Sequence, residues 1–534
     1  MNHAEIRVEL ANRIERLLAS DDLPVTLYPF QRETFEHMLA WLRDPNGTRY
    51  AYVEHATGLG KTVLFGALIA FCAGLRTLIV VPSKVLIEQT ARSLMRFTGG
   101  LLGHLSSLDD IQDADGTTIA LKGHEYFDVV ITTDETLLRH PARIAHDFAP
   151  HLIIWDECHW AYKNAARRTL PFFPEAPVIG FSATPDYLTT VAPAKATPVT
   201  LENGETLYCQ PGRRAEDHFG TCLDRRSARW GIENGWLAPL AWGVIDFKLS
   251  LDAVPVDEGA GGLDFQNQAL SDLLQANWSD TAQTLGRLYA GNKYGIADHR
   301  VFAICPSVAT AEELAAACAT IGVASACVSG KTSTRARNAT LTSFRKGTTR
   351  LLTSVFVLRE GWDEPNADVC LMLRPTRAYT LYMQTMGRVL RPNPDKVALV
   401  LDGRYTETTI APLSAASLFV PAGTEVTLGD IIVGPRISSP YLPPPKLREK
   451  IRVEPITIER WIGVFETFEM RGEQWGADKA VANAVDVSRL RVRHWAERGL
   501  VRTFEGLSRA RVKTTFYSVA DAQREADRVR DDLR

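Results

Sequence analysis

The sequence has 534 residues, too many for one ordinary domain, and this length predicts about three to four folded units. Apolar residues make up 45% of the chain and charged residues 23%, which is typical of globular proteins with sizeable cores. The net charge of −3 excludes a strongly basic protein, so a nucleic-acid contact would have to come from a local basic groove.

The first 23 residues have the amphipathic pattern of a helix and lack the apolar core of a signal peptide. The longest apolar run, 63–75, has thirteen residues and is too short to cross a bilayer. The eight cysteines contain no C-x-x-C pair, so we expect neither a zinc ribbon nor an iron–sulfur site. These features predict a cytoplasmic protein without membrane contact.

Between residues 24 and 190, short apolar runs alternate with longer helical patterns. The runs lack in/out alternation, which indicates parallel strands that are buried on both faces and joined through helices. We expect these strands at 50–53, 77–81, 128–132, 152–155 and 178–182.

The same pattern returns in a second lobe, 283–425, and the predicted fold class is therefore α/β with two tandem lobes on parallel sheets. Residues 191–282 between the lobes are expected to form a connector or insertion. The proline-rich segment 426–455 predicts a stiff linker. The strands of the second lobe are expected at 301–305, 324–329, 350–355, 368–373 and 397–402.

The stretch EHATGLGKT, 54–62, follows the first expected strand and precedes a helix. Such a turn lets backbone N–H groups converge on a phosphate, with the helix dipole behind them. His55 stands where the general pattern G-x-x-x-x-G-K-[ST] has glycine. Lys61 is expected to reach the β- and γ-phosphates, and Thr62 to hold Mg²⁺. The predicted nucleotide cradle consists of Thr57, Gly58, Leu59, Gly60, Lys61 and Thr62.

An acidic pair follows the buried run 152–155, at the sheet edge where open α/β folds bind ligands. Asp156 is placed to bind Mg²⁺, directly or through water. Glu157 would polarise the water that attacks the γ-phosphate. The alternative of a solvated acidic turn loses weight beside a glycine-rich loop on the same sheet.

In the second lobe, QTMGRVLRP (384–392) contains two arginines three residues apart. Arg388 and Arg391 lie at i and i+3, so one helical face can present both across the cleft, and Gln384 lies one turn earlier on that face. A guanidinium is always protonated and can stabilise the charge on a transferring phosphoryl group. The pattern therefore predicts an ATP site that is complete only when the lobes close.

Together these stretches resemble the motifs of the superfamily 2 helicases and translocases of the DECH-box kind, whose two RecA-like P-loop NTPase lobes bind ATP and Mg²⁺ between them. The resemblance covers about residues 24–405. The similar stretches appear in the family's order: LYPFQ (27–31, adenine-reading element), ATGLGKT (motif I), VVPSKVLIEQ (80–89, Ia), VITTDETL (130–137, Ib), DECH (156–159, II), SATP (182–185, III), LLTSVFVLREGWDEP (351–365, V) and QTMGRVLRP (VI).

The resemblance implies further roles for individual residues. Gln31 would read the adenine base, and Gly361 and Asp363 would lie near the nucleotide. A second set would couple the nucleotide site to the other lobe: His159, Ser182 and Thr184. A third set would meet the backbone of a nucleic-acid strand without reading its sequence: Ser83, Lys84, Thr132, Thr133, Ser307 and Thr353.

Within this superfamily the chain resembles the RadD-like bacterial DNA-repair ATPases. The similar stretches are DECH with SATP, GIENGWLAPL after the first lobe, and LRPTRAYTLYMQTMGRVLRP. The similarity ends after residue 405, because RadD-like tails carry a cysteine cluster that this chain lacks. That departure puts RadD's partners and pathway in doubt here.

The last segment, 456–534, is expected to be a small, mainly helical unit that resembles a MerR-type winged helix-turn-helix. Its second helix, 488–498, would be the recognition helix, with contacts from Arg489, Arg491 and Arg493. Between residues 488 and 515 there are eight basic residues against two acidic ones, a local electrostatic footprint for duplex DNA. A basic module that docks a protein partner is the alternative.

The expected function is an ATP- and Mg²⁺-dependent DNA helicase or translocase, with a role in DNA repair, recombination or replication. Three alternatives stay open: an RNA helicase, an ATP-driven clamp or switch that does not unwind, and the motor subunit of a restriction or phage-defence assembly.

Overall fold

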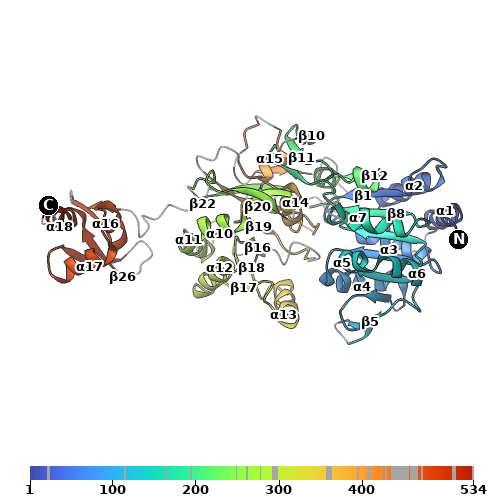
Figure 1. Ribbon diagram of the computed structural model, residues 1–534, viewed down its shortest axis with the longest axis horizontal. Helices are drawn as coiled ribbons and strands as arrows, with labels where there is room; N and C mark the ends of the chain where they lie inside the picture. Colours follow the sequence, from blue (N-terminus) through green and yellow to red (C-terminus); the bar gives the residue numbers. More distant parts are fainter. Residues whose placement is uncertain are drawn as a thin grey trace.

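The fold is described from a computed structural model, in which two α/β lobes follow one another along the chain (Figure 1). Among the described residues, no helix combines the length and apolar character that a bilayer crossing requires. The described residues are 1–20, 25–100, 102–113, 116–162, 165–192, 195–247, 249–259, 262–276, 278–290, 299–355, 364–393, 396–405, 411–421, 424–426, 428, 430–434, 456–457, 467–470, 473–507 and 513–531.

The first lobe is built on a nine-stranded sheet with the order β12-β1-β8-β7-β2-β6-β3-β5-β4. Its strands are β1 (Tyr50–His55), β2 (Thr77–Val81), β3 (Leu102–Leu105), β4 (Ile111–Gln112), β5 (Thr118–Lys122), β6 (Val129–Thr133), β7 (Leu152–Asp156), β8 (Val178–Ser182) and β12 (Thr221–Arg226). Its helices are α1 (His3–Ala19), α2 (Pro29–Arg43), α3 (Lys61–Phe71), α4 (Lys84–Thr98), α5 (Asp134–Arg139), α6 (Pro141–Asp147), α7 (Ala165–Thr169) and α8 (Glu216–Phe219), with 3₁₀ turns η1 (Cys158–Tyr162) and η2 (Leu170–Phe172).

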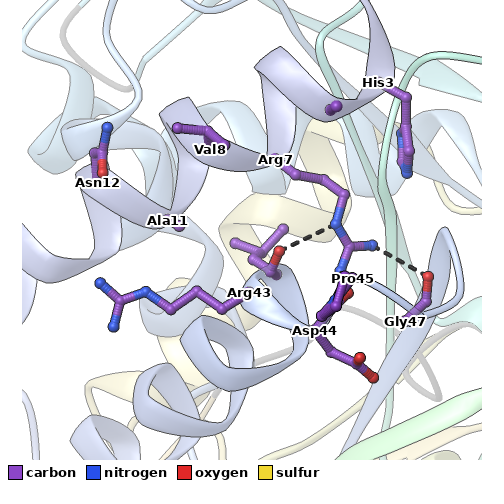
Figure 2. A pocket seen from close by; sticks show the side chains of 11 residues that line it. His3, Arg7, Val8, Ala11, Asn12, Arg43, Asp44, Pro45 and Gly47 are labelled. Carbon is purple, nitrogen blue, oxygen red and sulfur yellow. Dashed lines mark hydrogen bonds between the residues drawn. The ribbon is translucent and has the colours of Figure 1, made fainter.

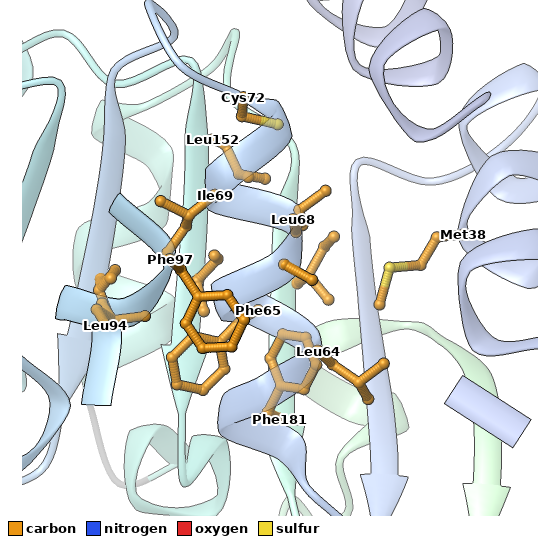
Figure 3. Close-up of a cluster of buried hydrophobic side chains, with 14 of the residues drawn as sticks. Met38, Leu64, Phe65, Leu68, Ile69, Cys72, Leu94, Phe97, Leu152 and Phe181 are labelled. Carbon is orange, nitrogen blue, oxygen red and sulfur yellow. The ribbon is translucent and has the colours of Figure 1, made fainter. Parts of the chain in front are cut away.

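Both faces of this sheet are covered, which explains the continuous apolar runs. In β2, Ile79 and Val81 belong to the core under α1–α4, whereas Leu78 and Val80 belong to the core under α5–α7. Helix α3 follows the phosphate loop and is packed on several sides (Figure 3). A Cβ at Gly66 of α3 would lie 2.5 Å from the Phe97 ring, so α3 and α4 approach closely only because this residue is glycine.

The second lobe has an eight-stranded sheet with the order β17-β18-β16-β19-β20-β13-β21, and β22 also pairs with β13. Its strands are β13 (Leu240–Asp246), β16 (Val301–Ile304), β17 (Ser325–Val328), β18 (Leu351–Ser354), β19 (Val369–Met372), β20 (Ala398–Arg404), β21 (Ile431–Val433) and β22 (Ile456–Thr457). Its helices are α10 (Asn267–Gln275), α11 (Trp278–Ala290), α12 (Val308–Thr320), α13 (Thr334–Arg345), α14 (Tyr379–Met386) and α15 (Ala415–Phe419).

The segment 191–282 contributes strands to both sheets, although the sequence suggested a separate connector. β12 pairs with β1 in the first lobe, and β13 pairs with β20 in the second. The segment also contains a hairpin, β14 (Val256–Gly259) and β15 (Gly262–Phe265). It further contains β10 (Thr197–Thr200), β11 (Thr206–Cys209) and α9 (Ala228–Glu233), and β11 pairs with the preceding β9 (Leu188–Thr189).

The C-terminal unit packs three helices on a four-stranded antiparallel sheet, with a core that includes Val492 and Trp495. Residues 514–518 of this unit, which the sequence predicted to be mainly helical, lie in a strand, because TTFYS is rich in β-branched and aromatic residues. The elements are β23 (Thr467–Met470), β24 (Glu473–Ala477), α16 (Asp478–Ala484), α17 (Arg489–Glu497), β25 (Thr503–Leu507), β26 (Lys513–Ser518) and α18 (Val519–Asp531).

Candidate functional site

The phosphate loop connects β1 to α3 with two glycines in the left-handed region, Gly58 at φ 96° and Gly60 at φ 80°. Side chains are disfavoured in that conformation, so glycines here let an anion approach the backbone closely. At the start of α3, Lys61 Nζ donates a hydrogen bond to the backbone oxygen of His55 at 3.0 Å. Burial lowers the pKa of Lys61, and the carboxylates of Glu157 and Asp156 oppose this shift.

Gln31 lies against this loop and is 1% exposed. Its Oε1 accepts a hydrogen bond from the Tyr28 N–H at 3.0 Å, and its Nε2 donates to the Leu59 carbonyl at 3.2 Å. A Cβ at Gly60 would lie 2.6 Å from Gln31 Nε2. The structure therefore brings the predicted adenine-reading residue into direct contact with the predicted phosphate cradle.

The acidic pair lies at the end of β7, and β8 separates this strand from β1. Asp156 Oδ1 accepts a hydrogen bond from the Glu157 N–H at 3.0 Å. Glu157 has φ 48°, a left-handed conformation that is uncommon for a residue with a side chain. Its Oε2 is buried 3.5 Å from His159 Nδ1 and accepts no hydrogen bond from the described residues. A buried carboxylate oxygen of this kind fits a site that holds a water or a ligand when bound.

The three residues of the predicted coupling set contact one another, and His159 also reaches the second lobe. His159 Nδ1 lies 2.9 Å from Ser182 Oγ, and His159 Nε2 lies 3.3 Å from Gln384 Nε2 on α14. Ser182 Oγ also accepts a hydrogen bond from the Thr184 N–H at 3.2 Å. Because Gln384 comes from the second lobe, this series of contacts joins two parts of the first lobe, the segment after β7 and the end of β8, to the opposite wall of the site.

The two arginines are not on a helix, contrary to the sequence prediction. Helix α14 ends at Met386, and the Arg388 N–H bonds to Thr385 O three residues back, as in a tight turn. Gly387 is the C-cap of α14. The turn still faces the phosphate loop. A Cβ at Gly387 would lie 2.8 Å from Thr57, and a Cβ at Gly58 would lie 3.7 Å from Arg391 Cγ.

The residues present fit a nucleotide with Mg²⁺. Thr62 follows Lys61 in α3, and its hydroxyl and the Asp156 carboxylate are oxygen ligands of the kind that Mg²⁺ prefers. Thr184 Oγ1 and Gln384 Oε1 are buried without a hydrogen-bond partner among the described residues. Gly361 and Asp363 lie outside the described residues.

The predicted strand-contacting residues differ in what they can offer. Ser83, Thr133 and Ser307 are N-caps of α4, α5 and α12, and Lys84 is exposed at the start of α4. The hydroxyl contacts expected of two threonines are wrong in this conformation, because both side chains are buried. Thr132 Oγ1 donates to Leu105 O at 3.1 Å, and Thr353 Oγ1 donates to Ala311 O at 2.7 Å.

In the C-terminal unit, α17 has Ser488 as its N-cap and carries Arg489, Arg491 and Arg493. Arg491 is exposed. Arg493 forms an ion pair with Asp478, a residue outside the basic stretch. The net positive charge of this surface is therefore smaller than the count of basic residues between 488 and 515 indicates.

The sequence did not single out Asp224, Thr34 or Leu237, which all lie at this site. His55 Nε2 lies 2.7 Å from Asp224 Oδ2, and Thr34 Oγ1 donates to the same oxygen at 2.8 Å. Leu237 packs on Gly58. Asp224 and Leu237 are far from the loop in the chain, so local patterns could not place them. The sequence signal for this contact was His55 at a position where the general pattern has glycine, because a buried histidine needs a hydrogen-bond partner.

A separate cavity of about 480 Å³ lies between α1 and α2 (Figure 2). Arg7 lines it, but its guanidinium is already bonded to backbone carbonyls, including Leu42 O at 3.1 Å and Thr48 O at 3.1 Å. These bonds tie α1 to the end of α2. Arg7 is therefore a structural residue rather than an anion ligand.

Comparisons with known proteins agree with this geometry. Residues 24–187 match the family described as type III restriction enzyme, res subunit, and residues 282–393 match the helicase conserved C-terminal domain. The chain is similar to a 51.5 kDa protein of Lactococcus phage (isolate 7-9), with 25% identity over 47% of this chain and 49% of that protein. It is also similar to IRC3 of Saccharomyces cerevisiae, whose name describes an ATP-dependent helicase, with 24% identity over 79% of this chain and 58% of that protein.

The chain thus spans about half to three fifths of the length of these curated relatives. Among solved structures, it is similar to a fragment described as the HsdR subunit of a type I restriction enzyme from Vibrio vulnificus YJ016, with 18% identity, 69% and 63% of the two chains covered, and a TM-score of 0.48. It is similar to the Type ISP restriction-modification enzyme LlaBIII bound to DNA, with 16% identity, coverage of 76% and 28%, and a TM-score of 0.49. With both family matches on its two lobes, the chain carries the tandem RecA-like domains of the superfamily 2 helicases.

Proposed function

We propose that the chain is an ATP- and Mg²⁺-dependent DNA helicase or translocase that acts in the cytoplasm. The observation that carries the proposal is the meeting of Gln384 with His159 and of Gly387 with Thr57, because these contacts join the two lobes around one nucleotide site. In such a site, ATP hydrolysis changes how the two lobes pack against each other, and each lobe would bind the nucleic-acid strand.

The residues have distinct roles in this proposal. Lys61 leaves the His55 carbonyl and binds the β- and γ-phosphates. Glu157 accepts a proton from the attacking water with its buried oxygen. Arg388 and Arg391 stabilise the charge that develops on the transferring phosphoryl group. Thr62 and Asp156 would hold Mg²⁺, which would supply positive charge against the phosphates.

DNA is preferred over RNA because two features of the C-terminal unit support a MerR-like winged helix-turn-helix. α17 lies where a recognition helix is expected, and the β25–β26 hairpin stands where a wing is expected. The match of the first lobe to a restriction enzyme subunit also supports DNA. A RadD-like role in DNA repair is part of this proposal, as is a protein partner docked on the C-terminal unit.

The test compares ATP hydrolysis by the wild-type chain and Glu157→Gln, each without nucleic acid and with single-stranded, forked or duplex DNA or RNA. We expect DNA to stimulate the wild type, and Glu157→Gln to bind ATP while hydrolysing it about 10²- to 10⁴-fold more slowly. Exposed Glu135→Gln is the matched control. Stronger stimulation by RNA would establish an RNA helicase instead, and the absence of any stimulation would refute a nucleic-acid motor.

A second candidate is the motor subunit of a restriction or defence assembly, which the family match of residues 24–187 favours. This motor would move along duplex DNA without separating its strands. Displacement of a triplex-forming oligonucleotide, with no unwinding of a fork, would distinguish it from a helicase. Hydrolysis with neither displacement nor unwinding would indicate an ATP-driven clamp.

A further inference from the structure

A short turn after α9, residues 234–238, lies between the two walls of the nucleotide site; we call it the connector turn. Gly235 has φ 73°, the left-handed conformation that ends a helix. The Trp236 N–H bonds to Gly231 O at 2.8 Å, and the Gly235 N–H bonds to Ile232 O at 3.0 Å. These two bonds form a Schellman motif, so the direction of the chain after α9 is fixed by its backbone.

The motif sends the side chain of Leu237 into the phosphate loop. Leu237 is fully buried. A Cβ at Gly58 would lie 2.9 Å from Leu237 Cδ2, and a Cβ at Gly231 would lie 2.8 Å from Leu237 Cδ1 and 3.2 Å from Leu59 Cδ2. The leucine therefore fills the space between α9 and the loop, with no room for another methyl group.

The next residue joins the turn to the second lobe. The Ala238 N–H donates to Leu390 O at 2.8 Å, directly before Arg391. Arg391 Cγ lies 3.7 Å from the Cβ position of Gly58, the same glycine that Leu237 touches. One turn thus contacts the loop through a side chain and the arginine segment through its backbone.

We infer that Leu237 is a positioning residue that sets the placement of the phosphate loop against Arg391 when the lobes close. The inference rests on the proposed ATP hydrolysis. Reaction rates depend steeply on such placement, and a shift of about 1 Å can cost about a hundredfold in rate. Removing the side chain of Leu237 lets the loop and the arginine segment settle closer or farther apart.

The experiment measures kcat, KM for ATP and thermal stability of the full chain with DNA. For Leu237→Ala we expect kcat to fall about tenfold or more, with KM within about threefold of wild type. Leu237→Met, which keeps the volume, should retain kcat within about threefold. The control is Leu314→Ala, which removes an equally buried leucine from α12 of the second lobe. It should lower the melting temperature comparably and leave kcat within about twofold of wild type.

A second variant tests the same contact from the other side. Gly231→Ala adds a methyl group against Leu237 and should also lower kcat. In the double variant Gly231→Ala/Leu237→Ala the new methyl occupies the vacated space, so the two losses should be less than additive. Equal kcat for wild type and Leu237→Ala, an equal loss in Leu314→Ala, or strict additivity would overturn the inference alone. A wild type that does not hydrolyse ATP would overturn the proposed function and this inference with it.

Discussion

His55 and Asp224 form a buried pair behind the phosphate loop, with 2.7 Å between Nε2 and Oδ2. His55 is fully buried, and its backbone carbonyl accepts the hydrogen bond from Lys61. Asp224 comes from β12, the edge strand beside β1. The pair therefore fixes the position of His55, whose carbonyl binds Lys61. Glycine at position 55 would have no side chain to pair with Asp224.

Replacing the acid tests this relationship. Asp224→Asn removes the charge that accepts hydrogen bonds from His55, Thr34 and Arg226. Because a buried partner is left poorly satisfied, we expect the free energy of unfolding to fall by about 2 kcal/mol. We also expect KM for ATP to rise about fivefold as the loop loosens, a change of about 1 kcal/mol. Denaturant titration and steady-state kinetics measure both.

The control for this variant is Asp217→Asn on the exposed α8, which should change neither quantity. If Asp224→Asn behaved like this control, the pair would have no part in positioning the loop. Burial alone would raise the pKa of Asp224, but hydrogen bonds from His55 and Thr34 lower it to about 2. The carboxyl thus stabilises the fold above about pH 4 and loses this effect as the pH falls toward 2.

Glu54 should make the free energy of unfolding depend on pH nearer to neutrality. It precedes His55 in β1 and accepts a hydrogen bond from Arg225 Nε at 2.6 Å. Burial raises the pKa of Glu54 to about 7, although Arg225 opposes the shift. The folded chain then holds more protons than the unfolded chain, so this group makes the free energy of unfolding fall as the pH rises from about 4.5 to 7. Glu54→Gln should remove that slope.

Urea titrations of wild type and Glu54→Gln between about pH 5 and pH 8 check this prediction. The difference between the two chains should change up to about pH 7 and then level off. A constant difference over the whole range would show that Glu54 ionises with its ordinary pKa.

Arg391 should not tolerate lysine. Arg391→Lys keeps the positive charge but loses the planar fork that can bind phosphoryl oxygens with two donors. We expect kcat to fall about 10²- to 10³-fold while ATP binding changes little, because the group acts mainly on the transition state. Arg139→Lys, on the exposed face of α5, is the matched control. Retention of kcat within about twofold would remove Arg391 from the catalytic set.

The C-terminal unit can be removed without disturbing the second sheet. Deletion of residues 467–534 leaves β22 paired with β13. We expect DNA affinity to fall about tenfold, with a weaker salt dependence, while hydrolysis without DNA stays within about twofold. Fluorescence anisotropy at several salt concentrations measures the slope.

A single substitution tests whether α17 contributes to this DNA binding. Arg491→Ala should lower the salt slope by about one, the loss of one phosphate contact. Arg528→Ala, exposed on α18, serves as control. If neither the deletion nor Arg491→Ala altered DNA binding, the unit would be a protein-docking module.

Much of the fold could be predicted because both faces of each sheet are covered. Strands buried on two sides leave uninterrupted apolar runs, and β2 begins and ends at the residues expected from TLIVV. The phosphate loop and the acidic pair were predictable for a related reason. Asp156 ends β7 and Gly60 lies directly before α3, positions that short stretches of sequence reveal.

Contacts between distant segments could not be predicted in the same way. Asp224 reaches His55 only because β12 returns to the edge of the first sheet, and nothing in the local sequence fixes that pairing. Thr353 looked like a surface hydroxyl, yet its oxygen bonds to Ala311 within the lobe. Arg388 was expected on a helix because of the i, i+3 spacing of the two arginines. The same spacing also fits the turn that follows α14, where Arg388 lies.

The position of β12 also determines where the first lobe can be cut. A recombinant fragment that stops near residue 190 would lack this strand and expose the hydrogen-bonding edge of β1, the strand that leads into the phosphate loop. Bare edges of this kind recruit strands from other molecules, so such a fragment would aggregate. The shortest first lobe that keeps all nine strands of this sheet extends through β12 to Arg226.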